Sequence, residues 1–397
     1  MRVEITPSLA CGTLQVPPSK SVSHRALIAA ALGEGTLVKN AGESADIEAT
    51  LDCLAALGAR AEKRGKDIFI GGLWPQKEEN ITVNARESGS TLRFLIPLAL
   101  AGGRKVSFKG QGRLLERPLS EYQALCKERG FLFEKQNDGL SVCGKLKAGE
   151  YRIDGSRSSQ FISGMLFVLP LLDGDSTLIV EGKSESISYI NLTLQTLAQF
   201  GISVTQKENT YFIQGNQRYR AAEIIVEGDW SNAAFPDALG HLGGNVTLTG
   251  LNDSSAQGDK IYKEYFKKLG TNEPMDLSDC PDLAPILFAL SAVYGGEFVG
   301  CKRLRLKESD RIFAMQTELQ KCGIVLTATE DRVSISPDGL KVPDEVIDGH
   351  NDHRIVMAMT VLLTRLGGTI KGAEAVAKSY PNFFDDIRAL GLEIKEC

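Results

Sequence analysis

One pattern recurs six times along the 397 residues and constrains the fold more than any other feature. In each copy an amphipathic helical segment ends at a glycine and is followed by an alternating strand pattern. Glycine can take a positive φ angle without a Cβ clash, so it ends the helix and lets the chain turn into the strand. The terminating glycines lie 53 to 72 residues apart, at Gly58, Gly130, Gly201, Gly270, Gly323 and Gly391. The sequence therefore predicts six related units.

Each unit combines helices with a small sheet. After four of the six helices the strand pattern continues across a short polar turn into a second strand, in 60–72, 132–144, 203–215 and 325–336. Such units pack their helices against one face of a sheet. Four other segments, 95–103, 164–174, 285–296 and 355–368, are apolar nearly all round. We predict that they are helices buried at the centre of each lobe, although periodicity alone leaves buried strands open.

The length predicts two domains, because single cores stop growing at about 250–300 residues. With 43% hydrophobic and 24% charged residues the composition excludes a disordered chain, a collagen-like chain and a coiled coil. Three repeats are complete near 224–235, where we place the boundary. Pro17 and Pro18 suit a stiff crossing segment. A substrate cleft between two lobes is the expected outcome.

Several classes of function are disfavoured by composition. No run approaches the roughly 18 apolar residues of a membrane span, and no basic, cleavable leader opens the chain, so we expect a cytoplasmic protein without a membrane partner. The eight cysteines are scattered with no CxxC pair, and the four histidines form no metal-binding pair, so neither a metal nor a disulfide framework is expected. The net charge of −5 argues against a nucleic-acid partner.

Basic residues nevertheless gather in small-residue turns that precede apolar helices in the N-terminal half. Lys20 and Ser21 come directly before such a helix, and Arg25 lies one turn inside it. Gly89 opens another, with Arg93 in its first turn. The N–H groups and positive dipole end of a helix N-terminus favour phosphate or carboxylate. The alternative is plain N-capping with solvated charges.

Two more segments of this half carry similar chemistry. In GRLLERPL, one arginine can pair with Glu116 while the other stays available for an anion; the two are Arg113 and Arg117. In DGSRSSQF, hydroxyl and amide groups precede a buried helix and suit phosphate oxygens or ligand hydroxyls, with capping as the alternative. These groups belong to Ser158, Ser159 and Gln160.

The C-terminal half repeats the design. Lys307 and Arg311 lie four residues apart, where a salt-bridged surface turn is the alternative. The segment 352–354, Asp-His-Arg, leads directly into an apolar helix, and Lys378 follows later. No GxGxxG follows a strand and no P-loop motif occurs, so a nucleotide site is not supported. The cations predict a transferase or lyase that closes around small phosphorylated carboxylates.

Six segments, in this order and at these spacings, resemble the 5-enolpyruvylshikimate-3-phosphate synthase family of enolpyruvyl transferases: PPSKSVSHRALIAAAL, GRLLERPL, DGSRSSQF, LRLKESDRI, NDHRIVMA and AKSYPNFF. The resemblance covers nearly the whole chain. It implies an α/β (α+β) fold of two inside-out, barrel-like lobes, each with three βαβαββ units. The first strand of the family crosses over, which implies an N-terminal lobe of 19–227, a C-terminal lobe of 1–18 plus 228–397, and an active site in the interlobe cleft.

The resemblance also implies a reaction. The family transfers the enolpyruvyl group of phosphoenolpyruvate to the 5-hydroxyl of shikimate 3-phosphate and releases phosphate through a tetrahedral intermediate, in aromatic amino acid (chorismate) biosynthesis. It uses no cofactor and no metal, and we expect a monomer whose partners are these two small molecules. The implied contacts to shikimate 3-phosphate are Lys20, Ser21, Arg25, Ser158, Ser159, Gln160, Ser186, Asp282 and Lys307. The implied contacts to phosphoenolpyruvate are Lys20, Gly89, Arg113, Gln160, Arg311, Arg354 and Lys378.

Four side chains are the candidates for catalysis. Asp282, beside Lys307, is the candidate base for the 5-hydroxyl, and Glu308 is the candidate for proton exchange at the methylene carbon. Lys20 would balance developing charge, and His353 would orient groups or relay a proton. The sequence leaves open how Asp282, Glu308, Lys20 and His353 divide the proton transfers.

The sequence departs from the family pattern in two places, the glycine loop and position 303. Glu87 stands where the family's glycine loop often has asparagine, and Ser90 replaces its threonine. These changes leave phosphoenolpyruvate affinity and sensitivity to the inhibitor glyphosate open. Arg303 stands where some members have an asparagine for the shikimate phosphate, so that contact is open too.

Two alternatives to this function remain. The UDP-N-acetylglucosamine enolpyruvyl transferases share the repeats, but their lysine-asparagine start and reactive loop cysteine are not matched here. An inactive homologue that serves as a binding domain is disfavoured, because the basic set and both candidate carboxylates are retained.

Overall fold

The computed structural model describes residues 1–73, 80–182 and 185–397, and these divide into two compact units. The N-terminal unit is Pro18–Glu227. The C-terminal unit combines Met1–Pro17 with Gly228–Cys397, so the start of the chain belongs to the unit that holds its end. Strand β1 (Arg2–Ile5) explains this membership, since it pairs antiparallel with both β21 (Gly368–Lys371) and β22 (Ile394–Glu396).

Three four-stranded sheets of the same design form the outside of the N-terminal unit. In each, the first two strands are parallel and the last two join antiparallel. In sheet order the strands are β14 (Glu223–Ile225), β3 (Thr36–Lys39), β5 (Asp67–Gly71), β4 (Arg60–Arg64); β6 (Asn80–Asn84), β7 (Lys105–Lys109), β9 (Gly139–Cys143), β8 (Leu132–Lys135); and β10 (Glu150–Asp154), β11 (Ser176–Glu181), β13 (Thr210–Ile213), β12 (Val204–Lys207).

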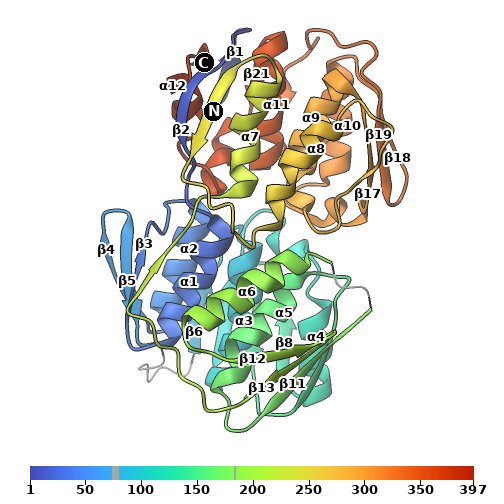
Figure 1. Ribbon diagram of the computed structural model, residues 1–397. Coiled ribbons are helices and arrows are strands. Elements are labelled where there is room, and N and C mark those ends of the chain that lie inside the picture. The colour runs from blue at the N-terminus through green and yellow to red at the C-terminus, as the bar shows by residue number, and fades with distance from the viewer. Residues whose placement is uncertain (74–79, 183–184) are drawn as a thin grey trace. The chain divides into compact units, whose positions relative to one another are not determined.

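Helices fill the interior of this unit, and the sheets lie around them (Figure 1). α3 packs against α5, α5 against α6, and α1 against both α2 and α6. Alanine, leucine and phenylalanine occupy nearly every turn of α1, α3 and α5, so these helices are buried on all sides rather than along one stripe. The helices are α1 (Lys20–Leu32), α2 (Ala45–Ala56), α3 (Gly89–Gly102), α4 (Ser120–Arg129), α5 (Ser159–Val168) and α6 (Ile187–Gln199), with short 3-10 turns η1 (Leu114–Glu116) and η2 (Leu169–Leu171).

The C-terminal unit repeats this plan with one reduced copy. Two sheets again have four strands in the same arrangement, but the third sheet, among the described residues, is only the parallel pair β15–β2. The strands not yet named are β2 (Cys11–Gln15), β15 (Asn245–Thr249), β16 (Met275–Asp276), β17 (Gly296–Val299), β18 (Leu326–Ala328), β19 (Arg332–Ile335) and β20 (Ile347–Asp348).

Its helices again form the interior. α9 packs against α11, α7 and α10, and α11 also contacts α7 and α10. The helices are α7 (Trp230–His241), α8 (Tyr262–Lys268), α9 (Ala284–Tyr294), α10 (Arg311–Lys321), α11 (His353–Leu366) and α12 (Phe383–Ala389), with 3-10 turns η3 (Gly258–Ile261), η4 (Pro281–Leu283), η5 (Lys302–Leu306) and η6 (Ala373–Lys378).

The structure confirms the main predictions about the fold. All six terminating glycines have φ between 67° and 108°, a region that costs a residue with a Cβ. The four apolar segments are helical, so the buried-strand alternative is wrong. The expectation of six full βαβαββ units needs correction, since the sheet of β15 and β2 lacks its last two strands in the described chain. Within the described residues the sheets are open, so the lobes are barrel-like only in having helices inside.

No helix in the described parts of the chain is both long and apolar enough to cross a bilayer.

Candidate functional site

The N-terminal ends of four helices lie together in the N-terminal unit. Arg25, one turn inside α1, donates from Nη1 to Ser21 O in the first turn of that helix at 2.8 Å and from Nη2 to Tyr189 O in the first turn of α6 at 2.9 Å. Gln160 at the start of α5 donates from Nε2 to Ser90 Oγ at the start of α3, at 2.8 Å. Helix N-termini present N–H groups without helical partners and the positive ends of helix dipoles. Their convergence builds a region that favours an anion.

Arg25 is the buried cation of this region. Its side chain is 2% exposed and donates only to neutral oxygens among the described residues: Thr193 Oγ1, Ser21 O at 2.8 Å and Tyr189 O at 2.9 Å. The guanidinium also lies 5.2 Å from the ring centroid of Phe94. Burial lowers the pKa of Arg25 to about 10. A desolvated cation held by neutral acceptors is stabilised by an anion that binds beside it.

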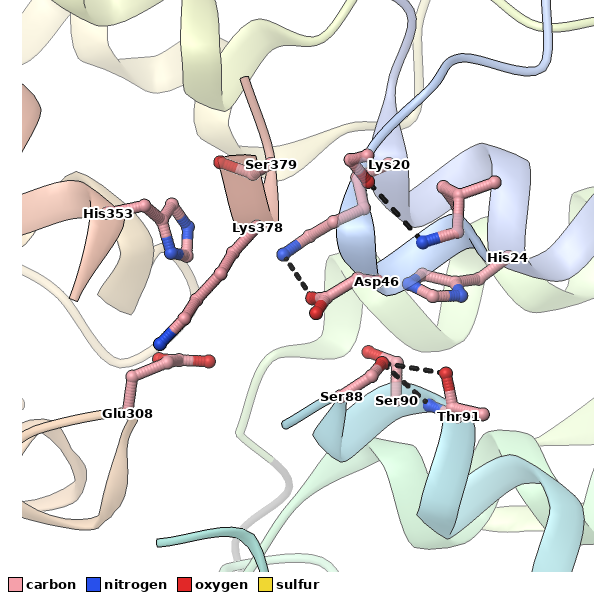
Figure 2. A network of polar contacts seen from close by, with 12 residues as sticks. Lys20, His24, Asp46, Ser88, Ser90, Thr91, Glu308, His353, Lys378 and Ser379 are labelled. Atoms are coloured by element: carbon pink, nitrogen blue, oxygen red, sulfur yellow. Dashed lines mark hydrogen bonds and ion pairs between the residues drawn. The ribbon is translucent and has the colours of Figure 1, made fainter. Parts of the chain in front are cut away.

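Lys20 is the first residue of α1 and is held by a partner that the sequence analysis missed. Its Nζ lies 2.9 Å from Asp46 Oδ2 in α2, and both side chains are less than 15% exposed (Figure 2). Ser44 caps α2 by accepting from Ile47 N, which places Asp46 in the first turn. The carboxylate therefore orients the ammonium at the start of α1. Ser44 before an amphipathic run signals the helix start, but no sequence signal pairs Asp46 with Lys20.

The amide of Gln160 has a fixed orientation. Arg93 donates from Nη1 to Gln160 Oε1 at 2.7 Å, so the Nε2 group is the one that faces Ser90. Ser158 caps α5 by accepting from Gln160 N at 3.3 Å, and Ser159 is buried in the first turn. Ser158 is therefore an N-cap, as the capping alternative predicted. Because the cap fixes the start of α5 at Ser159, Gln160 lies in the first turn of the helix.

The side chains of two arginines lie close to the backbone of Gly89. A Cβ on Gly89 would lie 2.7 Å from Arg117 Nη1 and 3.3 Å from Arg93 Nη1, so a larger residue would push these guanidinium groups away. Ser88 caps α3 by accepting from Thr91 N at 3.2 Å, as the close view shows (Figure 2). Arg93 and Arg117 therefore both lie beside the glycine loop, and the sequence analysis had named Arg117 as a possible partner of Glu116 without assigning it to a substrate.

Two other predicted residues of this unit lie elsewhere or in unusual geometry. Arg113 is 49% exposed, and among the described residues its polar partner is Glu116, at 3.3 Å from Nε. Of the two arginines in this segment, Arg113 is therefore the one that pairs with Glu116. Ser186 is buried at the start of α6 with a left-handed backbone, φ 57°. This conformation is costly for a serine and is often kept at functional positions.

Asp282 is the centre of a second cluster, which lies in the C-terminal unit. It sits in η4, directly before α9. Its Oδ1 accepts from Arg311 Nη1 at 2.8 Å and from Lys307 Nζ at 3.3 Å, and its Oδ2 accepts from Arg354 Nη2 at 3.0 Å. Three cations, one directly after η5 and two at the starts of α10 and α11, thus meet one carboxylate. In this unit too, the starts of helices converge.

Arg311 is the most enclosed of these cations, at 1% exposure. Besides Asp282, it donates from Nη2 to Glu308 Oε2 at 2.9 Å and from Nε to Asp352 Oδ2 at 3.0 Å. Asp352 also caps α11 by accepting from Arg354 N at 3.0 Å. Three carboxylates around one guanidinium balance the charge of this cluster without a ligand.

The electrostatics of the cluster follow from this arrangement. Burial raises the pKa of a carboxyl group, but Arg354, Lys307 and Arg311 outweigh it and hold the pKa of Asp282 well below its usual range. Burial lowers the pKa of Lys307 to about 8, against the opposing effect of Asp282. For Arg311 burial is outweighed by Asp352, Glu308 and Asp282, so its pKa is raised. In this state Asp282 is an anion and a weak base.

The remaining predicted residues border the same cluster. Lys378, at the end of η6, donates to the Asn351 carbonyl at 2.6 Å. His353 is buried, with Nδ1 3.9 Å from Asp352 Oδ1. Ser231, in the first turn of α7, accepts from Arg354 Nη1 at 2.6 Å and was missed by the sequence analysis. A serine after the capping Asp229 is an ordinary helix start, so nothing in the sequence distinguishes it.

The predicted site residues therefore fall into two sets, one per unit, and Arg113 stands apart at the surface. The set of the N-terminal unit is Lys20, Ser21, Arg25, Gly89, Ser158, Ser159, Gln160 and Ser186. The set of the C-terminal unit is Asp282, Lys307, Glu308, Arg311, His353, Arg354 and Lys378.

The fold is that of the enolpyruvyl transferases. It superposes on EPSP synthase from Acinetobacter baumannii with a TM-score of 0.80 at 24% identity, and each chain is covered to 99%. It superposes on the enolpyruvyl transferase NikO from Streptomyces tendae with a TM-score of 0.78 at 13% identity, with 99% and 98% of the two chains covered. At these identities the likeness shows the fold alone.

The sequence narrows the class to one family. Residues 6–273 and 270–387 match the family model described as EPSP synthase (3-phosphoshikimate 1-carboxyvinyltransferase). A protein of that name from Clostridium kluyveri is 40% identical over 420 aligned positions, which cover 99% of this chain and 98% of the relative. A second, from Clostridium acetobutylicum, is 39% identical with the same coverage. The chain belongs to the EPSP synthase family, and the resemblance read from its motifs is confirmed.

Proposed function

We propose that the protein transfers the enolpyruvyl group of phosphoenolpyruvate to the 5-hydroxyl of shikimate 3-phosphate, with release of phosphate. This is a step of the shikimate pathway of aromatic amino acid biosynthesis. Family membership and nearly full-length relatives named for this reaction support it. The same findings do not favour a UDP-N-acetylglucosamine transferase. We also expect a cytoplasmic monomer that binds no nucleic acid.

The observation that carries the proposal is the buried Arg25 among converging helix starts. Its neutral hydrogen-bond acceptors leave its charge to be balanced by a ligand, and the N–H groups at the starts of α1, α5 and α6 suit phosphate oxygens. We assign the phosphate of shikimate 3-phosphate to this place. The neighbouring hydroxyl and amide groups would complete its binding: Ser21, Ser158, Ser159, Gln160 and Ser186.

Phosphoenolpyruvate would bind the cations of the C-terminal unit, together with Lys20, Gln160 and the glycine loop. Its carboxylate and phosphate would take the place of Asp282 at Arg354 and Arg311. We propose that both sets of residues act on one bound pair of substrates, which requires the units to close on the ligands. Arg113 is half-exposed without a ligand, so its contact to phosphoenolpyruvate would form on closure.

This exchange of partners makes Asp282 a better base. When a substrate anion competes for Arg354 and Arg311, the opposite charges that lower the pKa of Asp282 are shared, and its pKa rises. Asp282 then accepts the proton of the 5-hydroxyl as the oxygen attacks C2 of phosphoenolpyruvate. Lys307, 3.3 Å from Asp282, would hold the ring hydroxyl in place.

Glu308 would complete the proton transfers. In the first step a carboxylic acid donates a proton to the methylene carbon, which gives the tetrahedral adduct. In the second step the carboxylate removes a proton from the resulting methyl group as the bond between C2 and the phosphate oxygen breaks, and phosphate leaves. Arg311 lies 2.9 Å from Glu308 and stabilises its anionic form between the steps. Lys20 and Lys378 would stabilise the departing phosphate, and His353 would orient the groups around it.

Phosphate release tests the reaction. We expect release only when both shikimate 3-phosphate and phosphoenolpyruvate are present, in a coupled phosphate assay with each substrate omitted in turn. UDP-N-acetylglucosamine in place of shikimate 3-phosphate serves as the control for the other transferase. Release with the sugar nucleotide, or without an acceptor, would contradict the proposal.

The pH dependence of activity should report Lys307. Its pKa of about 8 means that the side chain is charged below pH 8 and loses its charge as the pH rises further. We therefore expect kcat/KM to fall above about pH 8. Lys307→Arg keeps its charge over this range, since arginine has a pKa above about 12, and should shift the fall to higher pH.

The measurement is a pH–rate profile of both proteins. Lys302→Arg, which changes an exposed lysine paired with Glu330, is the matched control and should leave the profile unchanged. An unshifted alkaline fall in Lys307→Arg would show that another group controls it.

A further inference from the structure

A buried carboxylate outside the reacting cluster holds the loop that precedes α11. Glu318 is fully buried in α10, seven residues and two helical turns after Arg311. Its Oε2 accepts from Lys321 Nζ at 2.7 Å and from Asp348 N at 2.9 Å. Its Oε1 lies 2.7 Å from His350 Nε2. A carboxylate that is withdrawn from water needs such partners. One of the three, His350, lies in the loop, and Asp348 is the last residue of β20, which leads into it.

The loop itself has a conformation that needs support. His350 and Asn351 have φ angles of 48° and 50°, two consecutive residues with a Cβ in the left-handed region. Asp348 Oδ1 accepts from His350 N at 2.8 Å. With the contact to Glu318, both the backbone and the ring of His350 are fixed. The disfavoured backbone is thus kept by contacts of His350.

The conformation of this loop fixes the positions of two groups that contact the cluster, the Asn351 carbonyl and the Asp352 carboxylate. The Asn351 carbonyl accepts from Lys378 Nζ at 2.6 Å. The next residue, Asp352, caps α11 and accepts from Arg311 Nε at 3.0 Å and from Ser309 Oγ at 3.0 Å. Two residues of α10 therefore contact this segment: Arg311 at the start of the helix bonds Asp352, and Glu318 two turns later contacts His350.

We propose that His350, held by Glu318, is a positioning residue that orients Lys378 for phosphoenolpyruvate through the carbonyl of Asn351. The proposal rests on the proposed function in one respect, the assignment of Lys378 to that substrate. It adds a residue to which the sequence analysis gave no role. Loss of the contact to Glu318 would let the loop leave its left-handed conformation and would displace the Asn351 carbonyl, which accepts a hydrogen bond from the Lys378 ammonium.

Two substitutions of His350 separate the contact from the bulk of the ring. In His350→Gln the side-chain amide reaches the position of Nε2 and can still donate to Glu318. In His350→Asn the amide matches the position of Nδ1 instead and falls short of Glu318. The two variants are otherwise alike in polarity, so they form a matched pair.

The experiment is steady-state kinetics of the full-length protein with both substrates varied. We expect His350→Asn to raise the KM for phosphoenolpyruvate by about three- to thirtyfold, the range of coupling through a positioned element. The KM for shikimate 3-phosphate, whose phosphate we assign to the other unit, should stay within about twofold, and His350→Gln should resemble the parent in both values.

Three results would overturn the inference: a parental KM for phosphoenolpyruvate in folded His350→Asn, an equal rise of both KM values, or a defect in His350→Gln as large as that in His350→Asn. If His350→Asn does not fold, His350→Ala, which removes the ring without adding a misplaced amide, carries the same expectation. Activity of the parent protein with both substrates is measured alongside. Failure of the proposed function would therefore show in the parent, and failure of this inference only in the variants.

Discussion

Asp282→Asn is expected to lower turnover by at least about a hundredfold, or about 2.7 kcal/mol in the barrier, while the protein stays folded. The amide cannot take the proton of the attacking hydroxyl. It also places an N–H group where the carboxylate accepted from Arg311, Lys307 and Arg354. We expect the loss in kcat to exceed any change in KM for phosphoenolpyruvate, because the substrate anions bind the same cations that Asp282 occupies.

The measurement is steady-state kinetics with circular dichroism and thermal unfolding of each variant. Asp310→Asn is the matched control: Asp310 lies two residues after Glu308 and caps α10 by accepting from Phe313 N, a role that asparagine fills equally well. Its turnover should equal that of the parent. A folded Asp282→Asn protein with parental turnover would remove Asp282 from the role of base.

The second large effect is expected from Arg25→Met. This change should weaken binding of shikimate 3-phosphate by more than about a hundredfold, the size expected when a charge-assisted contact to phosphate is lost from a desolvated site. Methionine fills the buried volume between Phe94 and Thr193 without a charge. Replacing an isolated buried charge by an apolar side chain is often neutral or stabilising, so the free energy of unfolding should change by less than about 1 kcal/mol.

Thermal unfolding with and without shikimate 3-phosphate distinguishes these two effects. The parent should be stabilised as ligand is added, because a ligand that binds only the folded state raises its stability. Arg25→Met should unfold near the parental temperature without ligand and should show little shift with it. An undiminished shift in the variant would mean that the phosphate binds elsewhere.

Most of the fold could be predicted from local sequence patterns. The helix-ending glycines and the all-apolar segments depend on backbone conformation and burial, which neighbouring residues reveal, and both predictions are confirmed. The expectation of a full βαβαββ unit was wrong at the repeat that ends at Gly270, and the strand pattern of the sequence had already shown no second strand after that helix. After Gly270 the chain reads TNEPMDLSDCP, with prolines at 274 and 281 and no alternating pair of strands.

The residues of the candidate site could be predicted where charged or polar side chains stand close to the start of an apolar helix in the sequence. Arg25 lies one turn inside an apolar helix and Arg354 in the first turn of another, so burial of their charge could be expected. Asp46, Arg117 and Ser231 were missed because their partners lie far away in the sequence, at Lys20, Gly89 and Arg354. Such pairings depend on how the helices pack, which periodicity does not encode.

The balanced charge around Arg311 has a consequence for selectivity. Because Asp282, Glu308 and Asp352 already neutralise the cations of their cluster, a newly arriving anion gains only the difference between its own ion pairs and those it displaces. A simple ion such as inorganic phosphate, which touches few of these groups at once, gains little by this exchange. On the proposed assignment, phosphoenolpyruvate carries a carboxylate and a phosphate at a fixed separation and would replace several carboxylate contacts together. On that assignment, the internal counter-ions would favour phosphoenolpyruvate over small anions that lack its spacing of charge.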